Sequence, residues 1–185
     1  MRSAMLGGEL VGRRTLLLLV ALLMGGCASR VIVPSPATPG AVVSTPRDGV
    51  RVMESADGVF GSQTYTGSGR RLAGRVVQSL QGQFVDVQML ATTREADALR
   101  AARAAHAKFL VVPTILAWED RNTAWSMNRD RLRVQLALRD VTSDRVVNSV
   151  SFEARSRKFF IFGDPAPDAM LDRSFDRAVL ALLQR

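Results

Sequence analysis

The sequence has almost none of the side chains that build metal sites and disulfide bonds. Of its 185 residues, one is a cysteine, Cys27, and one is a histidine, His106. A single cysteine excludes an intramolecular disulfide, and one cysteine with one histidine cannot supply the ligand cluster of a structural zinc site or an iron–sulfur centre. We therefore expect neither a metal nor a cofactor, and Cys27 needs another explanation.

The sequence also lacks an apolar run long enough to cross a membrane. The stretch Leu16–Met24 holds nine apolar residues, whereas a helical span needs about 20. Arg13-Arg14 precede this stretch, and the small residues Gly25-Gly26 separate it from Cys27. This order is typical of a secretory signal peptide. Residues 1–26 are therefore predicted to be removed.

The residues before the cysteine resemble a lipoprotein processing site. Met24-Gly25-Gly26-Cys27 is similar to the lipobox, except that leucine is usual where Met24 stands. The resemblance implies a covalent diacylglyceryl and N-acyl lipid on Cys27, and two or three acyl chains anchor a protein stably in a membrane. Ala28 takes the place where aspartate favours the inner membrane in many Gram-negative lipoproteins, so the outer membrane, periplasmic side, is the predicted address. The start codon, Met1 or Met5, stays open.

The chain after the leader divides into a tether and one domain. Residues 27–46 include four prolines and show no sustained period, which predicts an extended spacer. Residues 47–185 have the length of a single domain.

Hydrophobic periodicity predicts the order β-α-β-α-β-β-α within residues 47–185. The expected elements are a strand at 50–54, a helix with Leu72, Val76, Leu80 and Phe84 on one face, a strand at 85–90, a helix from a capping box of Thr92 and Glu95 to about His106, a strand at 109–116, a hairpin at 131–155 and a helix at 170–182. The run at 109–116 is nearly all apolar, so we place this strand centrally, and Pro113 predicts a bulge there. The expected fold is α/β, a mixed sheet of about five strands with helices packed on it.

Several segments together resemble a known lipoprotein family. Gly67-Ser68-Gly69 before a helix, the run Phe109–Ile115, and Trp118-Glu119-Asp120-Arg121 with Thr123 and Trp125 follow each other as in the family catalogued as domain of unknown function 4823. The likeness covers roughly Val50–Leu183 and implies no assigned activity. More distantly, the element order looks like the periplasmic α/β domain of the curli secretion lipoprotein and the N-terminal part of TolB, a likeness of fold alone.

The charge balance is basic, with 25 basic and 17 acidic residues and a net charge of +8. Nearly all of the basic residues are arginine, and Arg131, Arg133 and Arg139 share the polar face of one alternating strand. Such a face suits the anionic head groups of lipopolysaccharide or phospholipid. No long run of like charges is present, so nucleic acid is not an expected partner.

Two sequence features have a functional and a structural interpretation, and we favour the structural one for both. His106 is the only histidine available for a Ser-His-Asp triad, but its place at a helix end favours contact with the last carbonyls. Gly67-Ser68-Gly69 is placed like a phosphate loop at a helix start, but it lacks the full glycine motif and the lysine. Helix capping by Ser68 is therefore expected.

The strongest candidate binding site is a loop with aromatic and charged side chains. It consists of Trp118, Glu119, Asp120, Arg121, Thr123 and Trp125. Such residues form binding patches, but tryptophans in a short loop also cover sheet ends, and the sequence leaves both interpretations open.

Glu119 and Asp120 are adjacent in the sequence, so in an extended strand their carboxylates point to opposite faces and cannot form a catalytic dyad. We therefore expect no enzymatic activity. The sequence predicts a membrane-anchored lipoprotein that binds or assembles with another envelope component, most simply a protein. The alternative is the anion-binding module.

Overall fold

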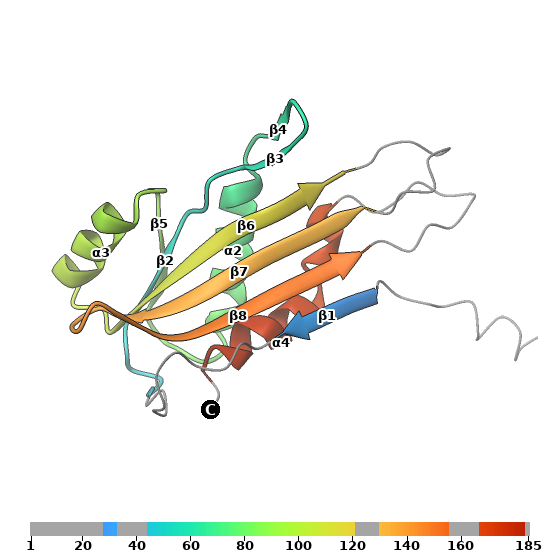
Figure 1. Ribbon diagram of the computed structural model, residues 1–185. Coiled ribbons are helices and arrows are strands. Elements are labelled where there is room, and N and C mark those ends of the chain that lie inside the picture. The colour runs from blue at the N-terminus through green and yellow to red at the C-terminus, as the bar shows by residue number, and fades with distance from the viewer. Residues whose placement is uncertain (1–27, 33–43, 121–129, 156–166, 184–185) are drawn as a thin grey trace, which may run out of the picture.

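A six-stranded sheet forms the centre of the protein, which a computed structural model describes for residues 28–32, 44–120, 130–155 and 167–183 (Figure 1). The strand order is β1-β8-β7-β6-β2-β5. The strands are β1 (Ala28–Ile32), β2 (Val50–Met53), β5 (Val87–Leu90), β6 (Phe109–Glu119), β7 (Arg131–Asp140) and β8 (Arg145–Arg155). The helices are α2 (Ser68–Leu80), α3 (Glu95–Ala104), the short 3-10 helix η1 (Pro167–Met170) and α4 (Arg173–Ala181), and β3 (Gly58–Phe60) with β4 (Gln63–Tyr65) forms a separate hairpin. The predicted α/β class is confirmed.

The sheet is mixed, and its connections explain which strands are parallel. β2 pairs in parallel with both β5 and β6, whereas β6, β7, β8 and β1 are successively antiparallel. Parallel neighbours need a crossover, and α2 and α3 supply the two crossovers between β2, β5 and β6. The central position predicted for the strand at 109–116 is confirmed, because β6 lies between β2 and β7.

The two faces of the sheet carry different layers. Phe109 and Val111 belong to the core that includes α2 and α4, whereas Leu110 and Val112 belong to a smaller core with α3. Successive side chains of a strand point to opposite faces, so α3 covers the face opposite α2 and α4. Figure 1 shows α2 and α4 together behind the sheet and α3 apart from them, near β2 and β5.

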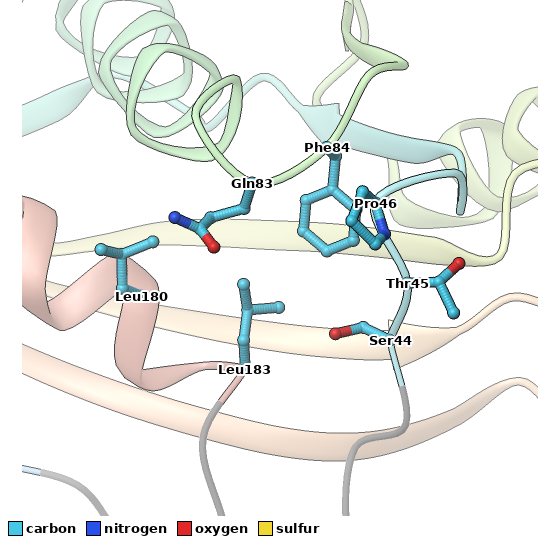
Figure 2. Close-up of a pocket in the computed structure, with 7 residues that line it drawn as sticks. All are labelled: Ser44, Thr45, Pro46, Gln83, Phe84, Leu180 and Leu183. Atoms are coloured by element: carbon cyan, nitrogen blue, oxygen red, sulfur yellow. The ribbon is translucent and has the colours of Figure 1, made fainter.

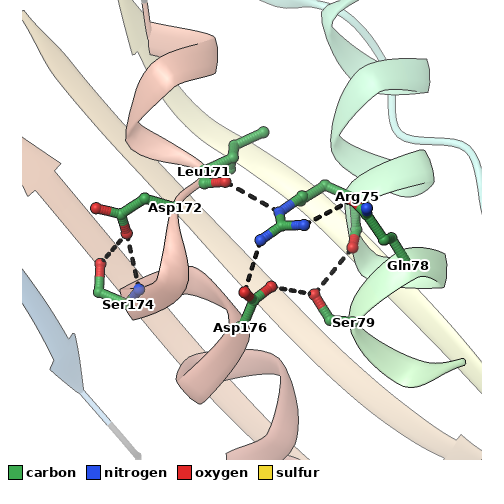
Figure 3. A network of polar contacts seen from close by, with 7 residues as sticks. All are labelled: Arg75, Gln78, Ser79, Leu171, Asp172, Ser174 and Asp176. Atoms are coloured by element: carbon green, nitrogen blue, oxygen red, sulfur yellow. Dashed lines mark hydrogen bonds and ion pairs between the residues drawn. The ribbon is translucent and has the colours of Figure 1, made fainter. Parts of the chain in front are cut away.

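Polar contacts fix α4 against α2 (Figure 3). The Arg75 guanidinium lies 2.6 Å from the Asp176 carboxylate, and its Nε donates to the backbone oxygen of Leu171 at 3.0 Å. Ser79 Oγ donates to the other Asp176 oxygen at 2.6 Å. One carboxylate on α4 is therefore bound by two side chains of α2.

The expected tether at 27–46 is wrong for its first part, because Ala28–Ile32 forms strand β1 at the sheet edge. Its residues pair antiparallel with β8, from Ala28 opposite Arg155 to Ile32 opposite Ser151. The strand was missed because five residues are too few to show a period and the prolines that follow dominate the composition. This strand also raises the strand number above the predicted five.

The bulge predicted at Pro113 in β6 is also corrected. The strand bulges between Ile115 and Ala117, not at Pro113, which stays paired with Leu136. Because β2 pairs with β6 only as far as Val111, Pro113 lies beyond the parallel ladder and its missing N–H costs no bond on that side.

The predicted capping box of α3 is not formed. The helix is preceded by Arg94 without a side-chain cap, and Thr92 Oγ1 instead accepts from the Arg94 backbone N–H at 3.2 Å. The hydroxyl thus closes the turn before the helix, which is a common competing use of threonine.

Candidate functional site

Trp118, the first residue of the predicted binding loop, lies inside β6 and in the core. Its side chain is 1% exposed. Gly58 of β3 packs directly on it, since a Cβ at Gly58 would lie 2.4 Å from the Trp118 Cβ. The Arg71 guanidinium carbon lies 5.9 Å from the centre of the indole, a cation–π contact. For Trp118 the structure thus supports the sheet-covering interpretation, and its indole is not exposed to a partner.

The next two residues of the predicted loop are half-buried at the end of β6. The Tyr65 hydroxyl on β4 donates to the backbone oxygen of Asp120 at 3.2 Å. In the strand register, Glu119 on β6 lies opposite Arg131 on β7. Burial raises the pKa of Tyr65, and the nearby charges of Asp120 and Asp130 raise it further. The phenol therefore stays a hydrogen-bond donor at neutral pH. The other predicted members, Arg121, Thr123 and Trp125, lie outside the described residues.

Two arginines at the same end of the sheet share one glutamate. Arg131 Nε lies 3.2 Å and Arg155 Nη2 2.9 Å from Glu153 Oε1. Burial raises the pKa of Glu153, but the hydrogen bonds and charges of Arg155 and Arg131 outweigh this effect and lower it. Part of the arginine charge expected to bind anions is therefore neutralised within the protein.

Beyond α3, one face of the sheet has no helix over it in the described part of the chain. In register, Thr114 on β6 pairs with Gln135 on β7, which pairs with Ser151 on β8. We call this region the open sheet face; its members are Thr114, Arg133, Gln135, Ser149 and Ser151, all exposed or half-buried. Polar side chains of this kind suit water or a flat partner.

Comparison with known proteins places this fold in a family. The family model described as "Domain of unknown function (DUF4823)" matches residues 45–177. The chain belongs to the DUF4823 family. This confirms the first resemblance seen in the sequence, whereas the more distant likeness to the curli secretion lipoprotein and TolB stays a prediction.

Solved structures share the fold of this DUF4823 chain at low sequence identity. The PelC dodecamer from Paraburkholderia phytofirmans matches with a TM-score of 0.62 and 20% identity over 85% of this chain and 98% of that one. A single-residue variant of the same PelC dodecamer matches with a TM-score of 0.64 and 19% identity over 85% of this chain and 99% of that one. Lipoprotein GNA1162 from Neisseria meningitidis overlaps less, with a TM-score of 0.41 and 11% identity over 72% of this chain and 93% of that one. No curated protein matches the chain.

In the DUF4823 domain, the loop Gly67-Ser68-Gly69 is occupied by a carboxylate of the protein itself. Asp57 accepts from the backbone N–H groups of Gly67 at 3.0 Å and Gly69 at 2.9 Å. Burial raises the pKa of Asp57, but these two bonds, Ser68 and the charge of Arg71 outweigh it and lower the pKa. An outside phosphate would have to displace Asp57.

The predicted capping role of Ser68 is corrected. Gly67 is the N-cap of α2 and has no side-chain cap bond. Ser68 Oγ instead accepts from the Gly58 N–H at 2.8 Å and donates to Asp57 Oδ1 at 3.4 Å. The serine therefore fixes the β3 strand to α2.

His106 follows α3 as predicted, in an exposed position. Its backbone has φ 51°, the left-handed conformation that ends helices, and its N–H donates to the Arg103 oxygen at 3.0 Å. The backbone, not the imidazole, thus contacts the end of α3. Within the described ranges, no hydrogen bond joins the imidazole to a serine or carboxylate, and no group of three or more His, Cys, Asp or Glu side chains is placed to hold a metal ion.

The domain also has an open hollow of about 420 Å³ beside the C-terminal end of α4 (Figure 2). Its lining residues are Ser44, Thr45, Pro46, Gln83, Phe84, Leu180 and Leu183. None of these side chains is charged, so the hollow offers surface for an apolar group beside the hydroxyl groups of Ser44 and Thr45 and the amide of Gln83.

Proposed function

We propose that this DUF4823 protein is a non-enzymatic envelope lipoprotein whose domain binds or assembles with another envelope protein through the open sheet face. The observation that carries the proposal is the unequal cover of the sheet. α2 and α4 bury one face, whereas the half of the other face beyond α3 carries polar side chains that are exposed or half-buried. A sheet face of this shape can receive a partner without exposing a large apolar patch beforehand.

The address is supported by the sequence before the domain. Arg13-Arg14, the apolar run Leu16–Met24 and the lipobox-like residues before Cys27 are what a lipoprotein leader requires. No helix in the part of the chain that the structure describes is long and apolar enough to cross a membrane. A lipid on Cys27 would supply the anchor.

The address is tested by the intact mass of the protein extracted from the membrane. We expect a chain that starts at Cys27 and carries added acyl mass. The Cys27→Ala variant should lack this mass and leave the membrane fraction. An unprocessed or unacylated wild-type chain would refute the lipoprotein assignment.

The binding face is tested by a photo-crosslinking amino acid placed at Gln135, in the middle of the open sheet face. The matched control is the same amino acid at Arg70, which is exposed on α2 on the other side of the sheet. We expect one discrete adduct at Gln135 and none at Arg70. The mass of the adduct separates a different envelope protein from a second copy of this chain, which is worth separating because PelC is described as a dodecamer. Equal labelling at both positions would refute the face assignment.

Anion binding through the arginine-bearing face is the alternative function. The observation in its favour is Arg133, which is exposed on the open sheet face between the paired Arg131 and the neutral Gln135. Binding of phospholipid vesicles or lipopolysaccharide would then fall steeply with salt and fall further in Arg133→Gln. Salt-tolerant capture of one protein favours the main proposal.

A further inference from the structure

The register of β1 places the start of the mature chain at a defined end of the sheet. Ala28 lies opposite Arg155, Arg155 lies opposite Arg131, and Arg131 lies opposite Glu119. These four residues form one row across β1, β8, β7 and β6. We call this row the anchor end.

A single peptide bond joins Ala28, in this row, to Cys27, the predicted site of lipidation. Consecutive Cα atoms are about 3.8 Å apart, and Cys27 directly precedes Ala28. A free tether of about 20 residues would have an end-to-end distance of roughly 25 Å and would let the domain turn in any direction. A cysteine next to a paired strand leaves no such freedom.

We propose that the lipidated protein stands with its anchor end against the bilayer surface, an inference that rests on the lipidation argued under "Proposed function". Arg131 and Arg155 then lie at the level of the lipid phosphates. The opposite end of β8, at Arg145, lies away from the membrane by roughly 30 Å, because a strand rises about 3.3 Å per residue. The open sheet face then stands upright in the periplasm instead of lying on lipid.

The chemistry of the anchor end agrees with a lipid surface. Arg155 has a side chain that is 56% exposed, so its guanidinium can contact phosphate while Glu153 remains paired with Arg131.

The orientation can be measured with one fluorophore at either end of the same strand. Because acylation consumes the thiol of Cys27, the only cysteine, Arg155→Cys and Arg145→Cys each provide a single free thiol for a bimane label. Both positions are exposed, so they form a matched pair. Each labelled, acylated protein is reconstituted into phosphatidylethanolamine and phosphatidylglycerol vesicles that carry a nitroxide on the head group. Vesicles without nitroxide give the reference intensity.

We expect quenching at position 155 to be at least threefold stronger than at 145. Inserting 20 Gly/Ser residues between Cys27 and Ala28 should reduce quenching at 155 to the level at 145. Equal quenching at the two positions in a chain that carries acyl mass would overturn the orientation alone. A chain without acyl mass in the same preparation would overturn the proposed lipoprotein function and the orientation with it. If Arg155→Cys unfolds, Arg133→Cys on β7 provides a second position near the anchor end.

Discussion

Asp57 holds the start of α2 through backbone groups that would otherwise lack a partner. The first N–H groups of a helix have no acceptor within the helix, and the Asp57 carboxylate accepts from Gly67 and Gly69. In the chain, Asp57 lies between β2 and the β3–β4 hairpin. One side chain thus joins a helix start to the hairpin that covers Trp118.

Asp57→Asn should therefore lower the free energy of unfolding by about 1 to 2 kcal/mol at pH 7, the usual cost of a lost helix cap. The folded pKa of Asp57 lies below its ordinary value, so its contribution is complete above the unfolded pKa of about 3.9 and is lost as the pH falls through the folded pKa. Urea unfolding at pH 7 and pH 3 measures the difference. The control is Asp97→Asn, whose carboxylate pairs with the exposed Arg100 and should change stability by less than about 0.5 kcal/mol.

Trp118 is the residue for which sequence and structure differ most. In the sequence-based prediction the strand ends at residue 116, and Trp118 is grouped with the charged residues that follow it and thus placed in a loop. In the structure β6 continues to Glu119, and the bulge at Leu116 returns Trp118 to the same face as Ile115, opposite the buried Leu132. Neither the bulge nor the hairpin that covers the indole has a short-range signal in the sequence.

We expect Trp118→Ala to cost about 3 to 5 kcal/mol, the usual range for removing a buried large aromatic side chain. Thermal unfolding followed by circular dichroism measures this loss. Leu116→Ala, two residues earlier and 45% exposed, is the control and should be close to neutral. A Trp118→Ala variant that melts like the wild type would contradict the core position of the indole.

At the scale of elements, α2 contains two glycines with opposite requirements. A Cβ on Gly69 would lie 1.9 Å from the backbone oxygen of Ser55, whereas a Cβ on Gly74 would meet nothing within 4 Å. The first glycine permits the helix to pass close to the chain after β2. The second has no such role.

Gly69→Ala should therefore unfold or strongly destabilise the domain, and Gly74→Ala should stabilise it by up to about 1 kcal/mol, because alanine is the better helix former. The unfolding midpoints of the two variants in urea provide the comparison. If both changes stabilise the protein equally, α2 does not approach Ser55 as described.

The contact between α2 and α4 should give measurable coupling. In a double-mutant cycle with Arg75→Gln and Asp176→Asn, we expect a coupling free energy of about 1 kcal/mol, since both side chains are partly buried. The pair Arg94 and Asp97, with an arginine that is 80% exposed, is the control and should give a value near zero. Equal coupling in the two cycles would show that solvent screens the Arg75–Asp176 pair as well.

Elements with a clear period were predictable from the sequence. The apolar spacing of Leu72, Val76 and Leu80 predicted α2, and the alternation along 131–155 predicted the hairpin of β7 and β8. The strands β1, β3 and β4 have three to five residues each, too few to show alternation, and their pairing depends on distant residues. The candidate site was harder to predict than the elements. The burial of Trp118 and the binding of Asp57 to the Gly67-Ser68-Gly69 loop depend on how distant segments pack in the folded protein.

For the whole molecule, membrane attachment should be separable from folding. Both hydrophobic cores of the described domain consist of residues from Val50 onward, so Cys27→Ala should remove the proposed anchor without changing the fold. We expect the purified variant to melt within about 1 °C of the acylated protein in detergent, as followed by far-ultraviolet circular dichroism. A large drop in melting temperature would mean that the lipid itself stabilises the domain.

The position of β1 at the sheet edge also has a consequence for the order in which the protein folds. Ala28 precedes its partner Arg155 by more than 100 residues in the chain. Pairing over such a sequence separation forms late in folding. Until β1 arrives, β8 presents a bare strand edge, the kind of surface on which chains aggregate. We expect aggregation to compete with folding until that edge is closed, and a lipid on Cys27, as proposed, would slow the closing if it is attached before the strand docks.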